Sequence, residues 1–244
     1  MVKEFQILRF KRVPSTQDIA EKLAREGVRE FTVVVAQEQT RGRGRYGRRW
    51  FSPMGGLWFT IILRPKFEAI YIPFIGYAMA CSIIKTFDIL NVKLGIKWPN
   101  DIVYNNLKVG GILVESAVVG RKTLYALVGV GLNINNEIPS ELRTQAISIR
   151  DILGEKLDLN RLLTEILGRF KEEYLKIPSR IAEIIDFYNK RLAIKGREVE
   201  VECDGTTIRG KCIKLDMDGA LIVKSKDAVV KICYGEVRKV HIKH

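Results

Sequence analysis

The sequence predicts an α+β protein, in which a mixed, mainly antiparallel sheet is packed with helices and followed by a small C-terminal β-barrel. Apolar residues make up 47% of the 244 residues, which is enough for a buried core. Several strand-like runs follow one another through short turns, which favours antiparallel pairing over βαβ winding. Beyond residue 196 only short strand-like runs remain, as expected of a small barrel or sandwich.

The first predicted helix begins at Ser15, a suitable N-cap with Asp18 as its partner at N3, and it ends at Gly27. Runs of β-branched and apolar residues predict the strands of the main sheet, at 31–37, 57–63, 93–98, 102–104, 109–119 and 124–134. The turn-forming pairs at 105–106 and 120–121 join the later runs into hairpins.

Three further stretches predict helices. Residues 70–90 indicate a core helix, because small residues spread through them permit close packing. Leucines and aromatic residues recur at helical spacing over 159–174, and this apolar stripe is best explained by core packing. A last helix is expected over 181–192.

The C-terminal strands are separated by Asp-Gly dipeptides at 204–205 and 218–219, which are hairpin signals. This change of texture favours a boundary near residues 190–195. We therefore predict a first domain of residues 1–192 and a small β-barrel domain of residues 193–244.

The charge balance and the residue counts narrow the classes of function. Lysine and arginine outnumber the acids by 41 to 28, which suits a nucleic acid, a nucleotide or an acidic protein, although a solvated lysine-rich surface gives the same balance. The only histidines, His241 and His244, lie at the C-terminus, which disfavours a histidine base. The cysteines form no CxxC pair, so free thiols are expected and zinc is not. Without a signal pattern or an apolar run of ~20 residues, a cytoplasmic protein is expected.

The stretch RGRGRYGRRW opens a long loop, residues 41–56, between two predicted strands. Its glycines allow the backbone to turn tightly, and successive amides in such a loop can bind an anion. Its arginines offer bidentate donors to a carboxylate or a phosphate. This arginine loop therefore predicts an anion-binding site, with a solvated cationic loop or a disordered RNA-binding segment as the alternatives.

KWPND, residues 97–101, follows a predicted strand. Pro99 fixes the backbone after Trp98, whose flat ring suits either a ligand or the core. Asn100 and Asp101 stand at a strand end, where side chains can face a ligand. The alternative is that this segment is simply a turn.

Two glycine-containing segments follow. In KVGGILVE, residues 108–115, Lys108 can reach across an open backbone surface to a phosphate oxygen, or it can be a surface lysine of a hairpin. GVGLN, residues 129–133, lacks the third glycine and the helix of a dinucleotide-binding fingerprint. We expect a ligand or another backbone to pack against its glycines, with Asn133 donating and accepting at the sheet edge.

Taken together, these stretches resemble the motifs of biotin protein ligases. The matching pieces are Ser15-Thr16, Gln39 through GRGR to WFSP, GGLWFT, KWPND, KVGGILVE and GVGLN, in the family's order and spacing. The resemblance covers residues 10 to 190 or so, and the C-terminal strands resemble the family's SH3-like barrel. Because Ser15 stands so near the start, the chain resembles a short form that lacks the N-terminal DNA-binding domain of some members.

The resemblance implies a class II synthetase fold of the kind shared by biotin and lipoate ligases. It implies that ATP, with Mg²⁺, adenylates biotin to biotinyl-5′-AMP and releases pyrophosphate. A specific lysine of a biotin carboxyl carrier protein domain, part of a biotin-dependent carboxylase, then receives the biotin. The expected protein is a homodimer that binds neither DNA nor a membrane.

The resemblance also assigns roles to single residues. Biotin would be bound by Ser15, Thr16, Gln39, Gly42, Arg43, Trp50, Lys108, Gly111 and Gly129. ATP and the adenylate would be bound by Arg43, Arg45, Trp50, Asn100, Asp101, Lys108 and Asn133. The residues expected to carry catalysis are Arg43, Arg45, Lys108 and Asp101. Trp98 would join Trp50 as an apolar wall, and Mg²⁺ would be held through the ATP phosphates, with Asp101 as the candidate protein ligand.

The second step needs a proton acceptor, because a lysine amine with a pKa of about 10.4 is mostly protonated at neutral pH. We hypothesise that Asp101 accepts or orients that proton. One alternative function is a lipoate-attaching ligase of related fold. Another is a non-enzymatic RNA-binding protein, for which Tyr46 and Trp50 are the only aromatic candidates in RGRGRYGRRW.

Overall fold

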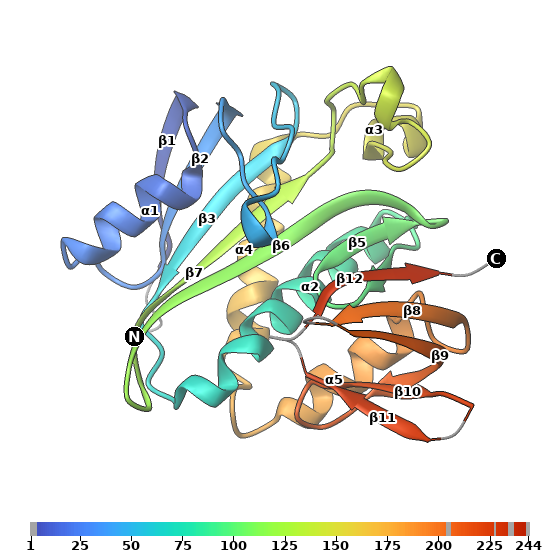
Figure 1. Cartoon of the computed structure of the whole chain (residues 1–244). Coiled ribbons are helices and arrows are strands. Elements are labelled where there is room, and N and C mark those ends of the chain that lie inside the picture. Colours follow the sequence, from blue (N-terminus) through green and yellow to red (C-terminus); the bar gives the residue numbers. More distant parts are fainter. Residues whose placement is uncertain (1–3, 204–205, 227, 234–236, 243–244) are drawn as a thin grey trace.

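A seven-stranded mixed sheet lies at the centre of the structure, a computed structural model that describes residues 4–203, 206–226, 228–233 and 237–242 (Figure 1). Its strand order is β1-β2-β3-β7-β6-β5-β4. The strands are β1 (Gln6–Val13), β2 (Thr32–Gln39), β3 (Leu57–Leu63), β4 (Gly95–Lys97), β5 (Asp101–Tyr104), β6 (Leu107–Val119) and β7 (Lys122–Leu132). β1 is parallel to β2 and the other neighbours are antiparallel, which confirms the predicted mixed, mainly antiparallel sheet.

β1 is a strand that the sequence pattern did not predict. It is an edge strand whose basic side chains, Arg9, Lys11 and Arg12, are exposed, so it lacks the apolar run that marks the inner strands. Its register pairs Val13 with Gln39 at the end of β2. This pairing brings the segment that follows β1 next to the start of the arginine loop.

The helices cover both faces of the sheet (Figure 1). They are α1 (Thr16–Arg25), α2 (Ile72–Ile89), α3 (Ile149–Leu153), α4 (Leu159–Tyr174) and α5 (Ile181–Arg191). In β2, Val34 packs beneath α1, whereas its neighbours Val33 and Val35 join the larger core with α2 and α4. β2 therefore reads as a continuous apolar run, because it is buried on both faces.

The predicted helix ends are largely those observed. Ser15 is the N-cap of α1, and its hydroxyl accepts a hydrogen bond from the amide of Gln17 at 3.2 Å. The short helix α3 was not predicted, although Ser148 caps its start and Gly154, with φ 79°, ends it. A five-residue helix carries too little apolar periodicity to be seen in the sequence.

A second, antiparallel sheet follows α5, with the order β11-β10-β9-β8-β12. Its strands are β8 (Glu198–Cys203), β9 (Thr206–Leu215), β10 (Leu221–Lys224), β11 (Val229–Ile232) and β12 (Val237–Ile242). Within the described residues β11 and β12 are its two ends, so the sheet is open where a closed barrel was expected. The turn at 218–219 is confirmed, with Gly219 at φ 85°, whereas the one expected at 204–205 lies outside the described residues.

Buried residues of the second sheet, such as Val201 and Leu221, belong to the same contiguous core as α2 and α4. The division into residues 1–192 and 193–244 stays a prediction. Within the described chain, one helical stretch, Ala69–Ile89, is long and apolar enough to cross a membrane. Within its apolar window of 18 residues, 67% is buried inside the protein, as in the core helix predicted from its small residues.

Candidate active site

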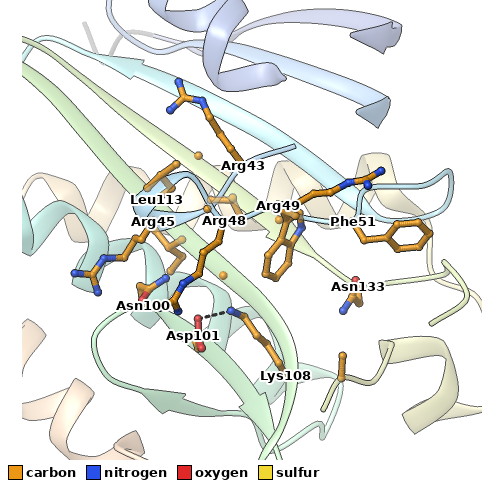
Figure 2. Close-up of a pocket in the computed structure, with 18 of the residues that line it drawn as sticks. Arg43, Arg45, Arg48, Arg49, Phe51, Asn100, Asp101, Lys108, Leu113 and Asn133 are labelled. Atoms are coloured by element: carbon orange, nitrogen blue, oxygen red, sulfur yellow. Dashed lines mark ion pairs between the residues drawn. The ribbon is translucent and has the colours of Figure 1, made fainter. Parts of the chain in front are cut away.

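A cavity of about 470 Å³ opens between the arginine loop and the ends of several strands of the main sheet (Figure 2). All but one of the predicted site residues line it. They are Ser15, Thr16, Gln39, Arg43, Arg45, Trp50, Asn100, Asp101, Lys108, Gly111, Gly129 and Asn133. The sequence segments that carry these residues, from 15 to 133, therefore converge on one site.

Gly42 is the exception, because it belongs to the fold of the loop. Its carbonyl accepts a hydrogen bond from the amide of Trp50 at 2.8 Å. A Cβ at this position would lie 2.6 Å from Ser52 Oγ and 2.7 Å from the Trp50 carbonyl oxygen. Gly42 thus lets the two arms of the arginine loop close on each other.

The arginine loop is folded, and its turn is closed by backbone hydrogen bonds. The Gly44 amide donates to the Arg48 carbonyl at 2.8 Å, and Arg43 bridges Arg49 across the turn. Tyr46 at the tip has φ 57°, and its ring lies under the Arg45 guanidinium, 5.2 Å away. Four arginines of this loop line the cavity, namely Arg43, Arg45, Arg48 and Arg49. In Figure 2 the Arg48 side chain points toward Asp101, whereas the other three extend in different directions.

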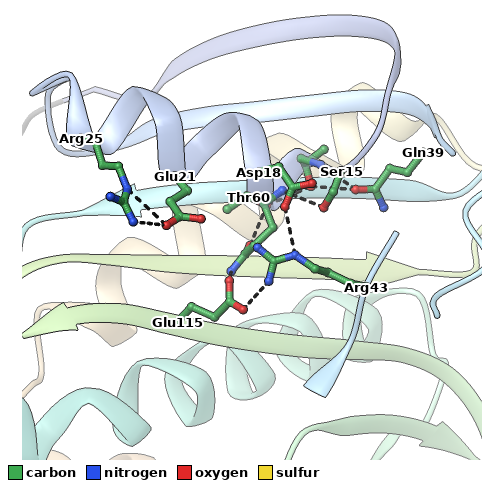
Figure 3. Close-up of polar contacts among 10 residues, drawn as sticks. Ser15, Asp18, Glu21, Arg25, Gln39, Arg43, Thr60 and Glu115 are labelled. Atoms are coloured by element: carbon green, nitrogen blue, oxygen red, sulfur yellow. Dashed lines mark hydrogen bonds and ion pairs between the residues drawn. The ribbon is translucent and has the colours of Figure 1, made fainter. Parts of the chain in front are cut away.

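Arg43 is held by two carboxylates (Figure 3). Its Nε donates to Asp18 at 3.0 Å, and its Nη1 forms an ion pair with Glu115, which also accepts from Gln17 Nε2 at 2.9 Å. Burial opposes the charge of Arg43, but the hydrogen bonds and charges of Glu115 and Asp18 outweigh it and raise the pKa of the guanidinium. Asp18, predicted as a helix-capping partner, therefore serves to bind Arg43.

One end of the cavity is a buried network of neutral hydrogen-bonding groups. Gln39 Oε1 accepts from the amide and the hydroxyl of Thr16, at 2.7 and 3.1 Å, and Gln39 Nε2 donates to Ser52 at 2.9 Å. Thr60 Oγ1 lies within hydrogen-bond distance of two acceptors, Thr16 Oγ1 at 2.9 Å and Gln17 Oε1 at 3.0 Å. The groups of this network are amides and hydroxyls, with the Glu115–Arg43 ion pair joined to it through Gln17, so this end suits a polar, uncharged ligand group.

A charged pair marks another part of the cavity. Lys108 Nζ lies 2.7 Å from Asp101 Oδ1 (Figure 2). The same nitrogen lies 4.8 Å from the centre of the Trp50 ring. The register of β5 and β6 slips between Ile102 and Val103, a bulge that turns Lys108 toward the pocket. Both side chains remain partly exposed, at 34% and 24%, so a ligand can reach them.

Trp50 explains the glycines of GVGLN. A Cβ at Gly131 would lie 2.5 Å from Trp50 Nε1, and one at Gly111 would lie 3.5 Å from the same ring. The indole therefore rests on open backbone, as the glycines of the strand led us to expect. Trp50 Nε1 is buried and has no hydrogen-bond partner among the described residues, which leaves a donor in the wall of the site.

Trp98 differs from the expected ring wall. It borders the cavity, but only 1% of its surface is exposed, and it packs in the main core. Its Nε1 donates to the hydroxyl of Tyr77 at 3.2 Å. Trp98 thus anchors the segment before Asn100 from behind and offers little surface to a ligand.

Comparison with known proteins shows which protein family the chain belongs to. Residues 9–133 match the model of the biotin/lipoate A/B protein ligase family. The chain belongs to this family. It is 31% identical over 229 residues to the bifunctional ligase/repressor BirA of Bacillus subtilis, a match that covers 91% of this chain and 70% of the relative. It is 30% identical over 224 residues to the biotin–[acetyl-CoA-carboxylase] ligase of Paracoccus denitrificans, covering 87% of this chain and 92% of the relative.

A solved structure supports the same family. The biotin protein ligase from Aquifex aeolicus in complex with biotin and ATP superposes with a TM-score of 0.86 at 29% identity, covering 98% of this chain and 99% of that chain. The fold predicted from the resemblance, a biotin ligase-like mixed sheet with helices, is thus confirmed. A second antiparallel sheet accompanies it in this family member.

The sequence motifs did not predict the residues that hold Arg43 in place, namely Asp18 and Glu115, together with Gln17, which bonds Glu115. Asp18 and Glu115 are 97 positions apart, and only the sheet brings them to one guanidinium. No motif could have paired them. The signal that was available is the position of Glu115, which lies on the same face of β6 as the cavity residues Gly111 and Leu113.

The described residues contain no group of three or more His, Cys, Asp or Glu side chains that could hold a metal ion. Asp101 is a single carboxylate, already paired with Lys108. A single carboxylate fits an Mg²⁺ ion that is bound mainly by the nucleotide, with phosphate and water oxygens as its main ligands. Asp101 would then supply at most one protein ligand.

Proposed function

We propose that this protein is an ATP-dependent biotin–protein ligase. The observation that carries the proposal is that one cavity joins a neutral hydrogen-bonding end to a cluster of arginine and lysine side chains. Biotin has the matching halves, since its ureido ring is polar and uncharged and its valeryl chain ends in a carboxylate. Homologues and structural neighbours that are biotin protein ligases support the same activity.

The neutral end would bind the ureido ring. That ring carries one carbonyl acceptor and two N–H donors, and Ser15, Thr16 and Gln39 present both kinds of group on rigid elements. Because Thr16, Gln17 and Thr60 are buried and hydrogen-bonded to each other, their positions are set before a ligand arrives. We assign this end of the cavity to biotin.

The first chemical step joins two anions. A carboxylate oxygen of biotin attacks the α-phosphorus of ATP, the bond to the β-phosphate oxygen breaks, and pyrophosphate leaves. Arg43, Arg45 and Lys108 would reduce the repulsion between the reactants and stabilise the charge that develops. Mg²⁺ would supply further neutralisation of the phosphates, with Asp101 as the candidate protein ligand.

In the second step a lysine amine attacks the carbonyl carbon of biotinyl-5′-AMP and AMP leaves. The amine must lose a proton, and Asp101 is the carboxylate that lines the cavity beside Lys108. A phosphate oxygen that binds Lys108 would weaken its ion pair with Asp101. Asp101 is then available to accept or orient the proton of the amine.

The acceptor would be a specific lysine of a biotin carboxyl carrier protein domain, since the Paracoccus relative is named for acetyl-CoA carboxylase. The resemblance to the family further favours a cytoplasmic homodimer. Positive net charge around the loop would suit an acidic carrier surface, because complementary charge accelerates encounter.

A direct test is a thermal shift with biotin, ATP and Mg²⁺, followed by mass spectrometry of the protein-bound ligand. Biotin with ATP should raise Tm well above the effect of either alone, because a tightly held intermediate stabilises the folded state. The recovered mass should be that of biotinyl-5′-AMP. Lipoate in place of biotin is the control, and a response to lipoate, or none to biotin, would refute the assignment.

A further inference from the structure

The second sheet and the segments beside its strands contact the cavity lining and the core behind it. Val240 of β12 lines the cavity directly. Arg197, just before β8, donates to Asn106 Oδ1 at 2.8 Å, and Asn106 is itself a lining residue. The Gly219 carbonyl, in the turn before β10, accepts from the hydroxyl of Tyr77 at 2.9 Å. The contact between Gly219 and Tyr77 continues through the core, because Tyr77 also bonds Trp98, which precedes Asn100 and Asp101 in the sequence.

Tyr77 is fully buried on α2, between the second sheet and Trp98. An indole N–H can only donate and a carbonyl can only accept. The single hydroxyl of Tyr77 therefore donates to Gly219 at 2.9 Å and accepts from Trp98 at 3.2 Å. Its two hydrogen bonds have fixed directions, and neither can reverse without leaving a buried group unpaired.

Trp98 is joined through the backbone to the residues that face the cavity. The Pro99 carbonyl accepts from the hydroxyl of Tyr188 at 3.4 Å, and the ring of Tyr188 packs edge-on against Tyr77 at 4.9 Å. The Asn100 carbonyl accepts from the Ile112 amide at 2.9 Å. The segment is thus anchored from the core on one side and from β6 on the other.

We propose that Tyr77 is a positioning residue for the adenylation step. Through Trp98 it aligns Asn100 and Asp101 for the nucleotide, and the turn at Gly219 in the second sheet anchors it. The inference rests on the proposed ligase function and assigns the second sheet a part in nucleotide binding. Biotin, held at the other end of the cavity, should be insensitive to this contact.

A substitution at Gly219 offers a second, independent way to displace Tyr77. Its φ is 85°, and an added Cβ would lie 2.8 Å from Tyr77 Cε2 and 3.2 Å from its hydroxyl oxygen. Gly219→Ala must therefore displace Tyr77. Gly27 is the matched control, because its φ of 84° gives an alanine the same backbone strain with nothing within 4 Å.

The kinetic test compares Tyr77→Phe with Tyr71→Phe, a control at the residue just before α2, whose ring packs against Phe67 and Phe74. In biotin-dependent ATP–pyrophosphate exchange, Tyr77→Phe should raise KM for ATP about tenfold, with KM for biotin within about twofold. Tyr71→Phe should match the wild type. Equal changes in both constants, or none, would overturn the positioning role. Absence of exchange in the wild type would instead refute the proposed function.

A spectroscopic test does not depend on activity. The indole N–H resonance of Trp98, assigned with Trp98→Phe, should shift in Tyr77→Phe and in Gly219→Ala. The resonance of Trp58, which donates to the Pro53 carbonyl at 2.8 Å, should not move. Gly27→Ala should leave both resonances in place. An unshifted Trp98 resonance in Tyr77→Phe would show that the hydroxyl does not hold the indole.

Discussion

At the scale of single residues, Arg43 shows how a cation can be both held and available. A guanidinium has five N–H donors in a fixed fork. Among the described contacts, Asp18 uses Nε and Glu115 uses Nη1, so Nη2 is left for a ligand. The carboxylates fix the orientation of the fork, and the remaining donors can meet a carboxylate or a phosphate oxygen.

Arg43→Ala should therefore accelerate release of biotinyl-5′-AMP. Loss of a charge-assisted hydrogen bond costs about 1.5–3 kcal/mol, so the dissociation rate should rise roughly 10- to 100-fold. Dissociation can be followed by chasing radiolabelled adenylate from the protein. Arg41→Ala, an exposed arginine of the same loop outside the cavity lining, is the control. Equal rates in the two variants would exclude the retention role.

Asp101 is the residue on which the second step depends. In Asp101→Asn the side chain keeps its shape but loses the carboxylate that would accept or orient the proton. Transfer of biotin from preformed adenylate to a carrier-domain lysine should slow about 100-fold, in the range of general-base effects, with exchange of ATP and pyrophosphate less affected. Asp186→Asn, exposed on α5, is the control. Equal loss in both half-reactions would instead indicate a role in ATP or metal binding.

At the scale of elements, the arginine loop and strand β7 form one packing unit. Trp50 rests on Gly131, where a Cβ would lie 2.5 Å from the indole nitrogen. The loop is fastened by this contact at one arm and by the Gly42–Trp50 hydrogen bond at its base. Closure of the loop over a ligand therefore depends on a strand glycine outside the loop.

Gly131→Ala should displace Trp50 and loosen the loop without straining the backbone. We expect a red-shifted fluorescence emission of Trp50 and weaker retention of the adenylate, because the indole becomes more exposed to water. Gly44→Ala is the control, since its methyl would meet only the Arg48 carbonyl oxygen at 3.7 Å. If Gly131→Ala behaves like Gly44→Ala in both measurements, Trp50 does not fasten the loop through this glycine.

The elements also show what the sequence could and could not predict. α4 and the inner strands were predictable, because burial on a defined face requires apolar residues at a regular spacing along the sequence. β1 was not, because an edge strand with exposed arginines lacks that period. The convergence of Ser15, Lys108 and Asn133 followed from the family resemblance. The Arg43 contacts with Asp18 and Glu115 required the register of the sheet, which no local pattern encodes.

At the scale of the whole molecule, both sheets share one core. Cys81 of α2 and Cys212 of β9 are fully buried in it, on opposite sides of the expected domain boundary. Burial raises the pKa of Cys81 well above its usual range and raises the pKa of Cys212 to about 12. Both thiols are therefore neutral at physiological pH and shielded from reagents.

Alkylation can test this shared packing. With iodoacetamide at pH 8, Cys81 and Cys212 should stay unmodified in the folded protein, while exposed Cys233 reacts. Because the folded-state pKa of Cys212 is raised, its contribution to stability is fully present below the ordinary thiol pKa of about 8.5 and is lost as pH rises toward 12. Peptide mass spectrometry reads the sites, with urea-unfolded protein as the positive control. Rapid labelling of Cys212 alone would show that the second sheet opens independently.

The seat of Trp50 on Gly131 has a consequence for the evolution of this site. Two positions 81 residues apart share one volume, so neither can change size alone. Relatives with a side chain at the position of Gly131 should carry a smaller residue at that of Trp50, and such pairs should arise together. A mutant library that varies only the loop would miss these paired substitutions. A library that varies the loop and the strand together would include them, and it could accept ligands of shapes that neither single-segment library can accept.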